Sequence, residues 1–238
     1  MAFGPEPRTA QAQVAVERID EGLRSFMLSV YNYMALGLAL TGVVAYLVAA
    51  TPALYQPIFG TPLKWVVMLA PLGFVFFLSA RIQKMSLSTA QLTFWAFAAV
   101  MGLSLASIFL VFTGASIARV FFITAGTFGA MSLYGYTTKR DLSGWGSFLF
   151  MGLIGVIIAM VVNIFLASAA LQFAISVIGV LVFVGLTAYD TQRIKEMYYE
   201  LDASDVAGRK AIMGALSLYL DFINMFIMLL HLFGAARE

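Results

Sequence analysis

The sequence predicts an all-α, polytopic membrane protein with seven membrane-spanning helices. Of its 238 residues, 62% are hydrophobic and only 11% are charged, whereas soluble domains carry about 25% charged residues. A helix that crosses a bilayer needs about twenty mostly apolar residues. Seven runs of this kind occur in the chain, at residues 26–50, 63–80, 90–112, 116–137, 146–168, 171–192 and 211–233.

Details within these runs predict how the helices pack. The second run is short and contains Pro71, which would kink the helix unless neighbouring groups take up the freed carbonyl. The fifth and sixth runs are separated only by Ser168-Ala-Ala-Leu, which predicts a tight hairpin. Small residues at 102–106 and 126–130 would let helix backbones approach closely.

The N-terminal segment is polar and differs from the seven runs. Residues 1–13 contain two prolines and are expected to be disordered. From Val14 onward, apolar residues recur at helical spacing among charged ones. This pattern predicts either a short helix at the cytoplasmic surface or an extension of the first spanning helix. We therefore divide the chain into a cytoplasmic tail, residues 1–25, and a seven-helix transmembrane domain, residues 26–238.

The lysines and arginines predict the orientation of the chain. With seven crossings and a cytoplasmic N-terminus, eleven basic residues fall on the inner side: Arg8, Arg18, Arg24, Arg81, Lys84, Lys139, Arg140, Arg193, Lys195, Arg209 and Lys210. Three remain outside: Lys64, Arg119 and Arg237. Inner loops of membrane proteins carry an excess of basic residues. The C-terminus is therefore expected outside the cytoplasm.

Several classes of chemistry are absent from the sequence. The chain has no cysteine, which excludes disulfides and thiol metal sites. It has no phosphate-binding glycine loop and no H-E-x-x-H zinc motif. The basic residues are spread among the inner loops, so nucleic acid is not an expected partner. We expect no enzymatic activity and no permanent cofactor.

One acid interrupts an otherwise apolar run near the C-terminus. Asp221 lies in Ser217-Leu-Tyr-Leu-Asp-Phe-Ile-Asn-Met-Phe. A carboxylate near mid-depth in a bilayer costs at least about 3 kcal/mol on insertion scales, so it normally faces a protein interior or a water-filled cavity. This helix is therefore expected to be surrounded by other helices. Helical spacing places one polar stripe on it: Ser217, Asp221, Asn224, Met228 and His231.

Asp190, at the inner end of the sixth run, is the second acid within a span. At about 1.5 Å per residue, both acids lie within about 15 Å of the inner surface on adjoining antiparallel helices, so they can meet. Two poorly solvated carboxylates would share a proton. Such a pair suits a proton sensor or a weak site for Ca²⁺, which takes about six to eight oxygen ligands. The supporting oxygens would come from Ser217, Asn224, Thr187, carbonyls and water.

Other interpretations of these residues remain open. Asp190 can instead be an interfacial acid bonded to nearby Thr, Gln or Arg193 groups. Arg81, at the inner end of the second run, is either a counter-charge for the acid pair or a snorkelling anchor at the membrane surface. His231 is more typical of an interfacial histidine than of a ligand.

Three segments resemble the bacterial branch of the transmembrane Bax inhibitor motif family. They are Ser217-Leu-Tyr-Leu-Asp-Phe-Ile-Asn-Met-Phe, Tyr189-Asp-Thr-Gln-Arg-Ile-Lys and Val30-Tyr-Asn-Tyr-Met-Ala-Leu-Gly-Leu. The resemblance implies a seven-helix bundle with the last helix at its centre and a pH-sensitive calcium leak across the bacterial inner membrane. It also implies that Asp190 and Asp221 form the proton-sensing pair, with Arg81 as the latch that holds them.

Two alternative functions accompany the leak. Some bacterial relatives are associated with a membrane-anchored AAA quality-control protease, so this protein can be a substrate or regulator of such a protease, engaged through residues 1–25. Intramembrane aspartyl proteases also carry a Tyr-Asp pair on one helix, as at Tyr189-Asp190. Their second motif, Gly-x-Gly-Asp, is missing at Asp221, which follows Leu-Tyr-Leu.

Overall fold

The computed structural model describes the backbone of residues 7–237 and the side chains of residues 20–237. In this part of the chain the elements are helices joined by short connections. They are α1 (Pro7–Ala50), α2 (Pro52–Phe59), α3 (Leu63–Arg81), a one-turn 3₁₀ helix η1 (Ile82–Lys84), α4 (Leu87–Val111), α5 (Gly114–Thr137), α6 (Ser143–Leu166), α7 (Ala169–Glu196) and α8 (Ser204–Phe233).

Seven of these helices are long and apolar enough to cross a membrane, and they coincide with the seven predicted runs. The prediction of an all-α, seven-span protein is therefore confirmed. The additional helix, α2, lies in the connection between the first two spans and was not predicted. It has only eight residues and begins at Pro52, in the first turn, where a proline costs no hydrogen bond.

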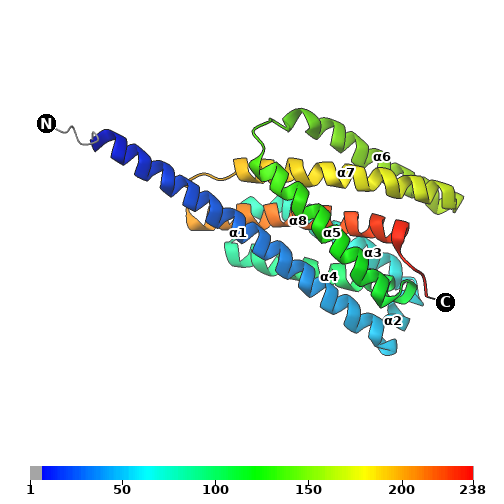
Figure 1. Ribbon diagram of the computed structural model, residues 1–238. Coiled ribbons are helices and arrows are strands. Elements are labelled where there is room, and N and C mark those ends of the chain that lie inside the picture. The colour runs from blue at the N-terminus through cyan, green and yellow to red at the C-terminus, as the bar shows by residue number, and fades with distance from the viewer. Residues whose placement is uncertain (1–6, 238) are drawn as a thin grey trace.

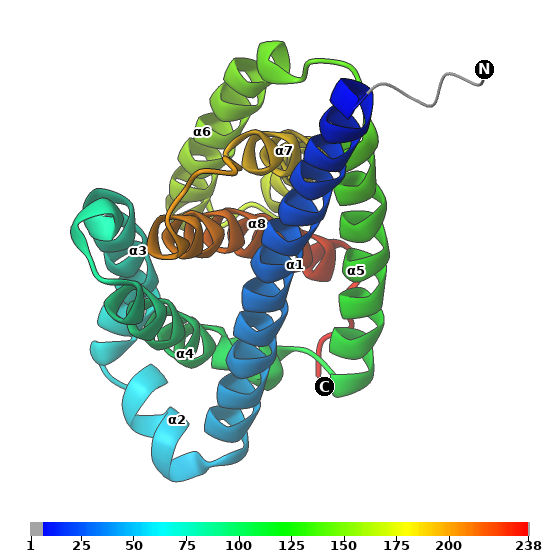
Figure 2. The same ribbon diagram turned by 90° about the vertical axis from the view of Figure 1, so that its left-hand side faces the viewer.

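Helix α8 lies at the centre of the bundle, with α1, α3, α4, α5 and α7 around it (Figure 2). About 72% of its most apolar 18-residue window is buried, against 11–33% for the other six spans. The expected central position of the last helix is confirmed. Helix α6 lies at the outside of the bundle, because its main packing partner is α7 rather than α8.

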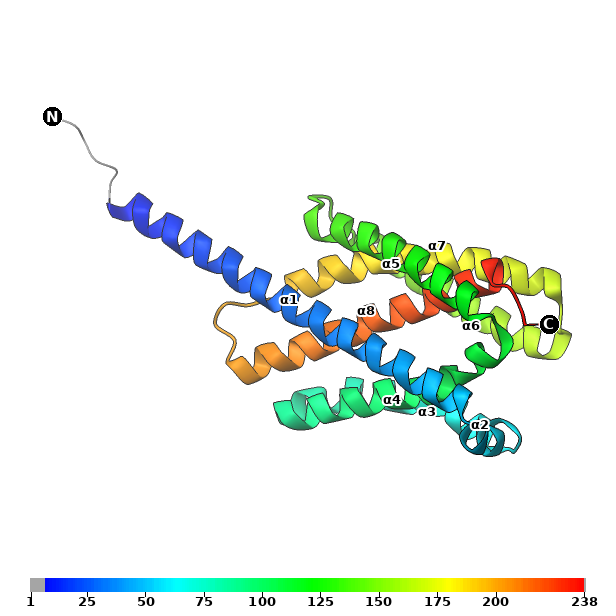
Figure 3. The same ribbon diagram turned by 60° about the horizontal axis from the view of Figure 1, so that its bottom comes forward.

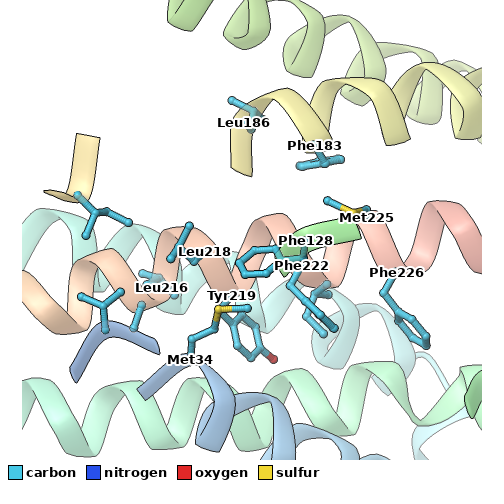
Figure 4. Close-up of a cluster of buried hydrophobic side chains, with 14 of the residues drawn as sticks. Met34, Phe128, Phe183, Leu186, Leu216, Leu218, Tyr219, Phe222, Met225 and Phe226 are labelled. Atoms are coloured by element: carbon cyan, nitrogen blue, oxygen red, sulfur yellow. The ribbon is translucent and has the colours of Figure 1, made fainter. Parts of the chain in front are cut away.

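The core is built from side chains that α8 directs to its neighbours. Figure 4 shows Tyr219, Phe222 and Phe226 of α8 together with Phe128 of α5 and Met34 of α1. The fully buried Tyr219 hydroxyl lies 2.7 Å from the Thr41 hydroxyl. The hydroxyl of Thr41 donates in turn to the Ala98 carbonyl at 2.8 Å. One chain of hydrogen bonds therefore joins α8, α1 and α4.

Close helix approach occurs at one of the two predicted small-residue segments. A Cβ on Gly102 would meet the backbone oxygen of Thr41 and the side chain of Val44, so α4 and α1 touch there. The prediction is wrong for Gly126, around which there is open space. On that helix, the close contact is made by Gly135, which faces the Ala188 backbone of α7.

The tight hairpin predicted near Ser168 is confirmed. Helix α6 ends at Leu166, Ala167 adopts a left-handed conformation with φ of 48°, and the Ser168 hydroxyl accepts a hydrogen bond from the Leu171 amide at the start of α7. Pro71 lies inside α3, which continues as one helix from Leu63 to Arg81.

Helix α1 is continuous from Pro7 to Ala50, which matches the predicted extension of the first span rather than a separate surface helix. The expectation of disorder is wrong for residues 7–13, which are helical; residues 1–6 lie outside the described part. The N-terminal turns of α1 project beyond the bundle (Figure 1).

The two ends of the bundle differ in charge. The N-terminal part of α1 and the α3–α4, α5–α6 and α7–α8 connections share one end, whereas α2 and the C-terminus lie at the other (Figure 3). The first end, here called the basic end, carries Arg24, Arg81, Lys84, Lys139, Arg140, Arg193, Lys195, Arg209 and Lys210. The opposite end carries Lys64, Arg119 and Arg237.

Candidate functional site

A cavity of about 740 Å³ lies between α3, α6, α7 and α8. We call it the aspartate cavity. Helices α7 and α8 supply nearly all of its polar side chains, and α3 and α6 supply mostly apolar ones. Its lining residues are Leu72, Val75, Gly146, Ser147, Phe150, Leu153, Ile157, Met160, Phe183, Leu186, Tyr189, Asp190, Arg193, Ser217, Leu220, Asp221 and Asn224.

Asp221 lies on the wall formed by α8 and is 4% exposed. Its Oδ2 atom is buried and has no hydrogen-bond partner among the described residues. A buried polar atom without a partner is costly, because it has lost water and gained nothing in exchange. An orphaned carboxylate oxygen on a cavity wall is therefore a sign of a site that takes up a proton, an ion or water.

Asp190, on α7, lines the same cavity as Asp221. The sequence argument placed the two acids on adjoining helices, and the structure brings them together. Neither polar neighbour along the chain is bonded to Asp190. Thr191 donates to the Thr187 carbonyl and pairs with Ser132, and Gln192 bonds Arg140 and Leu142. The interpretation of Asp190 as an acid held by Thr and Gln neighbours is therefore not what the structure contains.

The cation at the cavity is Arg193 rather than Arg81. Arg193 lies three residues after Asp190, hence on nearly the same face of α7, and it lines the cavity. Arg81 is exposed at the end of α3, a helix that contributes only Leu72 and Val75 to the lining. Among the described residues, neither arginine approaches an acid within 4.0 Å. The structure therefore does not place Arg81 as the counter-charge of the two acids, and Arg193 takes that position.

Of the predicted supporting residues, two line the cavity. Ser217 and Asn224 share the Asp221 face of α8. The Asn224 amide donates to the Leu220 carbonyl at 2.8 Å, which leaves its oxygen for the cavity. Thr187 is not brought to the site: it is fully buried, and its hydroxyl donates to the Phe183 carbonyl at 2.7 Å.

The other two residues of the predicted stripe, Met228 and His231, do not line the cavity. Met228 is buried with Val156 and Ile175 in a separate small apolar cluster. His231 is exposed and packs edge-on against Phe112. This position near the end of α8 fits the interpretation of His231 as an interfacial histidine rather than a ligand.

The donor set bears on metal binding. Within the described residues, no group of three or more Asp, Glu or His side chains is placed to hold a metal ion. A calcium ion at Asp190 and Asp221 would therefore complete its shell with neutral oxygens and water. Fewer charged ligands mean weaker calcium binding.

Sequence reasoning missed the contribution of α6 and the ring of Tyr189. The Tyr189 ring packs directly over Gly146, where a Cβ would overlap it, and both residues line the cavity. The signal available was the glycine itself, because a glycine inside an apolar helix often marks a close approach of a neighbour.

The fold and the cavity define a multi-pass α-helical membrane protein with two carboxylates in a cavity beside its central helix. A family model described as "Inhibitor of apoptosis-promoting Bax1" matches residues 23–238. This chain belongs to that family, the Bax inhibitor family.

Similar proteins occur across distant bacteria. The chain is 51% identical over 219 residues to the inner membrane protein YbhL of Escherichia coli K12, covering 91% of this chain and 94% of YbhL. It is 51% identical over 219 residues to a protein of Rickettsia prowazekii, covering 92% and 93%. A membrane protein of Streptococcus pyogenes serotype M3 is 36% identical over 218 residues, covering 90% and 94%.

Proposed function

We propose that this protein is a passive, pH-sensitive leak for calcium or similar cations, gated by Asp190 and Asp221. The observation that carries the proposal is the unpartnered, buried Oδ2 atom of Asp221 on the wall that it shares with Asp190. The sequence has no phosphate-binding glycine loop for ATP, so any flux would run down its gradient or be coupled to that of another ion.

The mechanism follows from the charge balance of the cavity. With one proton shared, the pair carries a single negative charge beside Arg193, and the arrangement is stable without an ion. Loss of that proton leaves two negative charges in a poorly solvated space, which is costly unless a cation enters or the helices separate. Proton uptake and cation entry are therefore alternatives at one site, and weak binding allows the ion to leave.

The proposed location is the bacterial inner membrane, with the basic end in the cytoplasm. YbhL is an inner membrane protein by its name. The excess of lysine and arginine at the basic end supports a cytoplasmic position for it. The N-terminus would then be cytoplasmic and the C-terminus outside.

The test is calcium flux into proteoliposomes across a range of external pH. Asp221→Asn keeps the size of the side chain but cannot ionise, so calcium flux should lose its pH dependence. Asp205→Asn is the matched control, because Asp205 is an exposed acid in the first turn of the same helix. A pH profile that is the same in Asp221→Asn and in the unaltered protein would refute the gate.

A second proposal is engagement of a membrane-anchored AAA protease through the N-terminal segment. It is favoured by the projection of α1 beyond the bundle (Figure 1). The test is a deletion of residues 1–19, which leaves the contact between the Phe26 and Tyr198 rings intact. This deletion should lower protease engagement and leave calcium flux unchanged; equal engagement would refute the second proposal.

A further inference from the structure

The aspartate cavity is much larger than a metal ion requires. Its volume is about 740 Å³, whereas one water molecule takes about 30 Å³ of liquid. Pockets of roughly 300–1,000 Å³ are typical of sites for drug-sized organic molecules. A site built only for an ion and its water shell would also be lined mostly by oxygen atoms, and this one is not.

The lining combines two carboxylates with aromatic rings. Phe150 of α6 and Phe183 and Tyr189 of α7 border the same space as Asp190 and Asp221. The face of an aromatic ring attracts cations, and the attraction is strongest where water is excluded. The two carboxylates outnumber Arg193, the one basic side chain in the lining, so the ionised cavity carries a net negative charge. Such a charge beside aromatic walls favours organic cations and disfavours anions.

The cavity can be reached from the lipid side. Helices α3 and α6 form its two outer walls, but α3 packs chiefly on α4 and α6 chiefly on α7, so these two helices do not close against each other. In Figure 2, α3 and α6 lie on the left, and α7 and α8 lie nearer the middle of the bundle. A hydrophobic solute dissolved in the bilayer can therefore enter without crossing the basic end.

We propose that the aspartate cavity is a binding site for hydrophobic organic cations, with the charge at Asp221 and the hydrocarbon part against α6 and α3. Asp221 is the anchoring group, because its Oδ2 atom is buried and unpartnered on the cavity wall. A neutral lipid chain would fill the apolar walls but leave that oxygen without a partner.

The test uses tetraphenylphosphonium and tetraphenylborate, which have the same shape and opposite charge. Binding of each radiolabelled ion is measured on the purified full chain in lipid nanodiscs, with a calcium chelator present and no ion gradient. Tetraphenylphosphonium should bind saturably and tetraphenylborate should not. Asp221→Asn should weaken the first by about tenfold or more, because the Coulomb attraction between the carboxylate and the phosphonium charge is lost.

A matched pair of variants on α6 tests the place of binding without touching either acid. Ile157 lines the cavity and Ile158 does not, and their side chains are 46% and 58% exposed. Ile157→Trp should narrow the cavity and weaken saturable tetraphenylphosphonium binding, whereas Ile158→Trp should leave it unchanged.

Two outcomes would overturn the inference. Equal binding of both ions would mean that the cavity has no charge preference. Binding of unchanged affinity in Ile157→Trp would mean that the cation sits elsewhere or only partitions into the bilayer. Because the measurement involves no flux, it separates this inference from the leak: the cation site can exist where calcium flux is insensitive to pH, and the reverse.

Discussion

The hydroxyl groups of Tyr219 and Thr41 lie 2.7 Å apart in the interior of the bundle. Since the Thr41 hydroxyl donates to the Ala98 carbonyl, the Tyr219 hydroxyl is the donor to Thr41. Tyr219 is only two residues from Asp221 and therefore points to a different side of α8. The central helix is fastened to α1 and α4 on one side and borders the aspartate cavity on another.

Tyr219→Phe should destabilise the protein without opening a cavity, because only the hydroxyl is removed. Hydrogen bonds between membrane helices are worth about 0.6 kcal/mol on average and at most about 1.7, so the loss in unfolding free energy should fall in that range. Chemical unfolding in detergent measures it. A double-mutant cycle with Thr41→Val supplies the control: strictly additive effects would mean that the two hydroxyls do not interact in solution.

Gly135→Ala should destabilise the α5–α7 contact by about 1–3 kcal/mol, the range for overpacking. The added Cβ would overlap the Ala188 carbonyl, and a backbone cannot turn aside as a side chain can. Gly129→Ala is the matched control on the same helix, because Gly129 has open space around it and alanine favours helix. In thermal unfolding in detergent, Gly135→Ala should have a lower unfolding temperature than Gly129→Ala and the unaltered protein. Equal stability of the two variants would contradict the close contact.

Arg193→Gln should change the pH profile of calcium flux, and Arg81→Gln should not. Arg193 lines the cavity together with Asp190, and its positive charge attracts negative charge there, whereas Arg81 is outside the cavity. Without that positive charge the shared proton is held more firmly, so the midpoint of the flux profile should move to higher pH. Flux measurements in proteoliposomes over a pH series compare the two variants. A shift in Arg81→Gln alone would restore Arg81 as the latch.

Asp141 should stabilise the start of α6 only while it is ionised. The hydroxyl and the backbone amide of Ser143 donate to its carboxylate and lower its pKa below the ordinary 3.8. The stabilisation is present above the ordinary pKa and is lost as pH falls through the lowered value of the folded protein. The Asp141→Ala variant should therefore have a lower unfolding temperature than the unaltered protein at neutral pH. This difference in unfolding temperature should shrink below pH 3.8. A difference that persists in acid would contradict stabilisation by the ionised carboxylate.

The seven spans could be predicted because apolar runs of bilayer length are a property of the chain itself. The position of Asp221 was predictable for a related reason: an acid in such a run must be covered by protein. Ser217 and Asn224 followed from helical spacing alone, and all three residues line one cavity. Helix α2 was not predicted, because its eight residues are too few to form an apolar run of bilayer length.

The counter-charge and the supporting hydroxyl could not be predicted, because both depend on how the helices turn toward one another. Arg81 and Arg193 each end a span at the basic end, and only packing decides that α7 and not α3 turns its terminal arginine to the cavity. Thr187 is one turn from Asp190 in sequence, yet its hydroxyl is used by its own helix. The position of α6 at the outside of the bundle could not be predicted for the same reason, because it too depends on helix packing.

The helix at the middle of this bundle is also the last of the seven spans along the chain. Six spans must enter the bilayer before the partner that most of them share has been synthesised, so their inward faces contact lipid or one another until then. The bundle can therefore be completed only after the seventh span has been inserted. A chain cut short before Ser204 would leave an open ring of helices, the kind of unfinished substrate that membrane proteases remove.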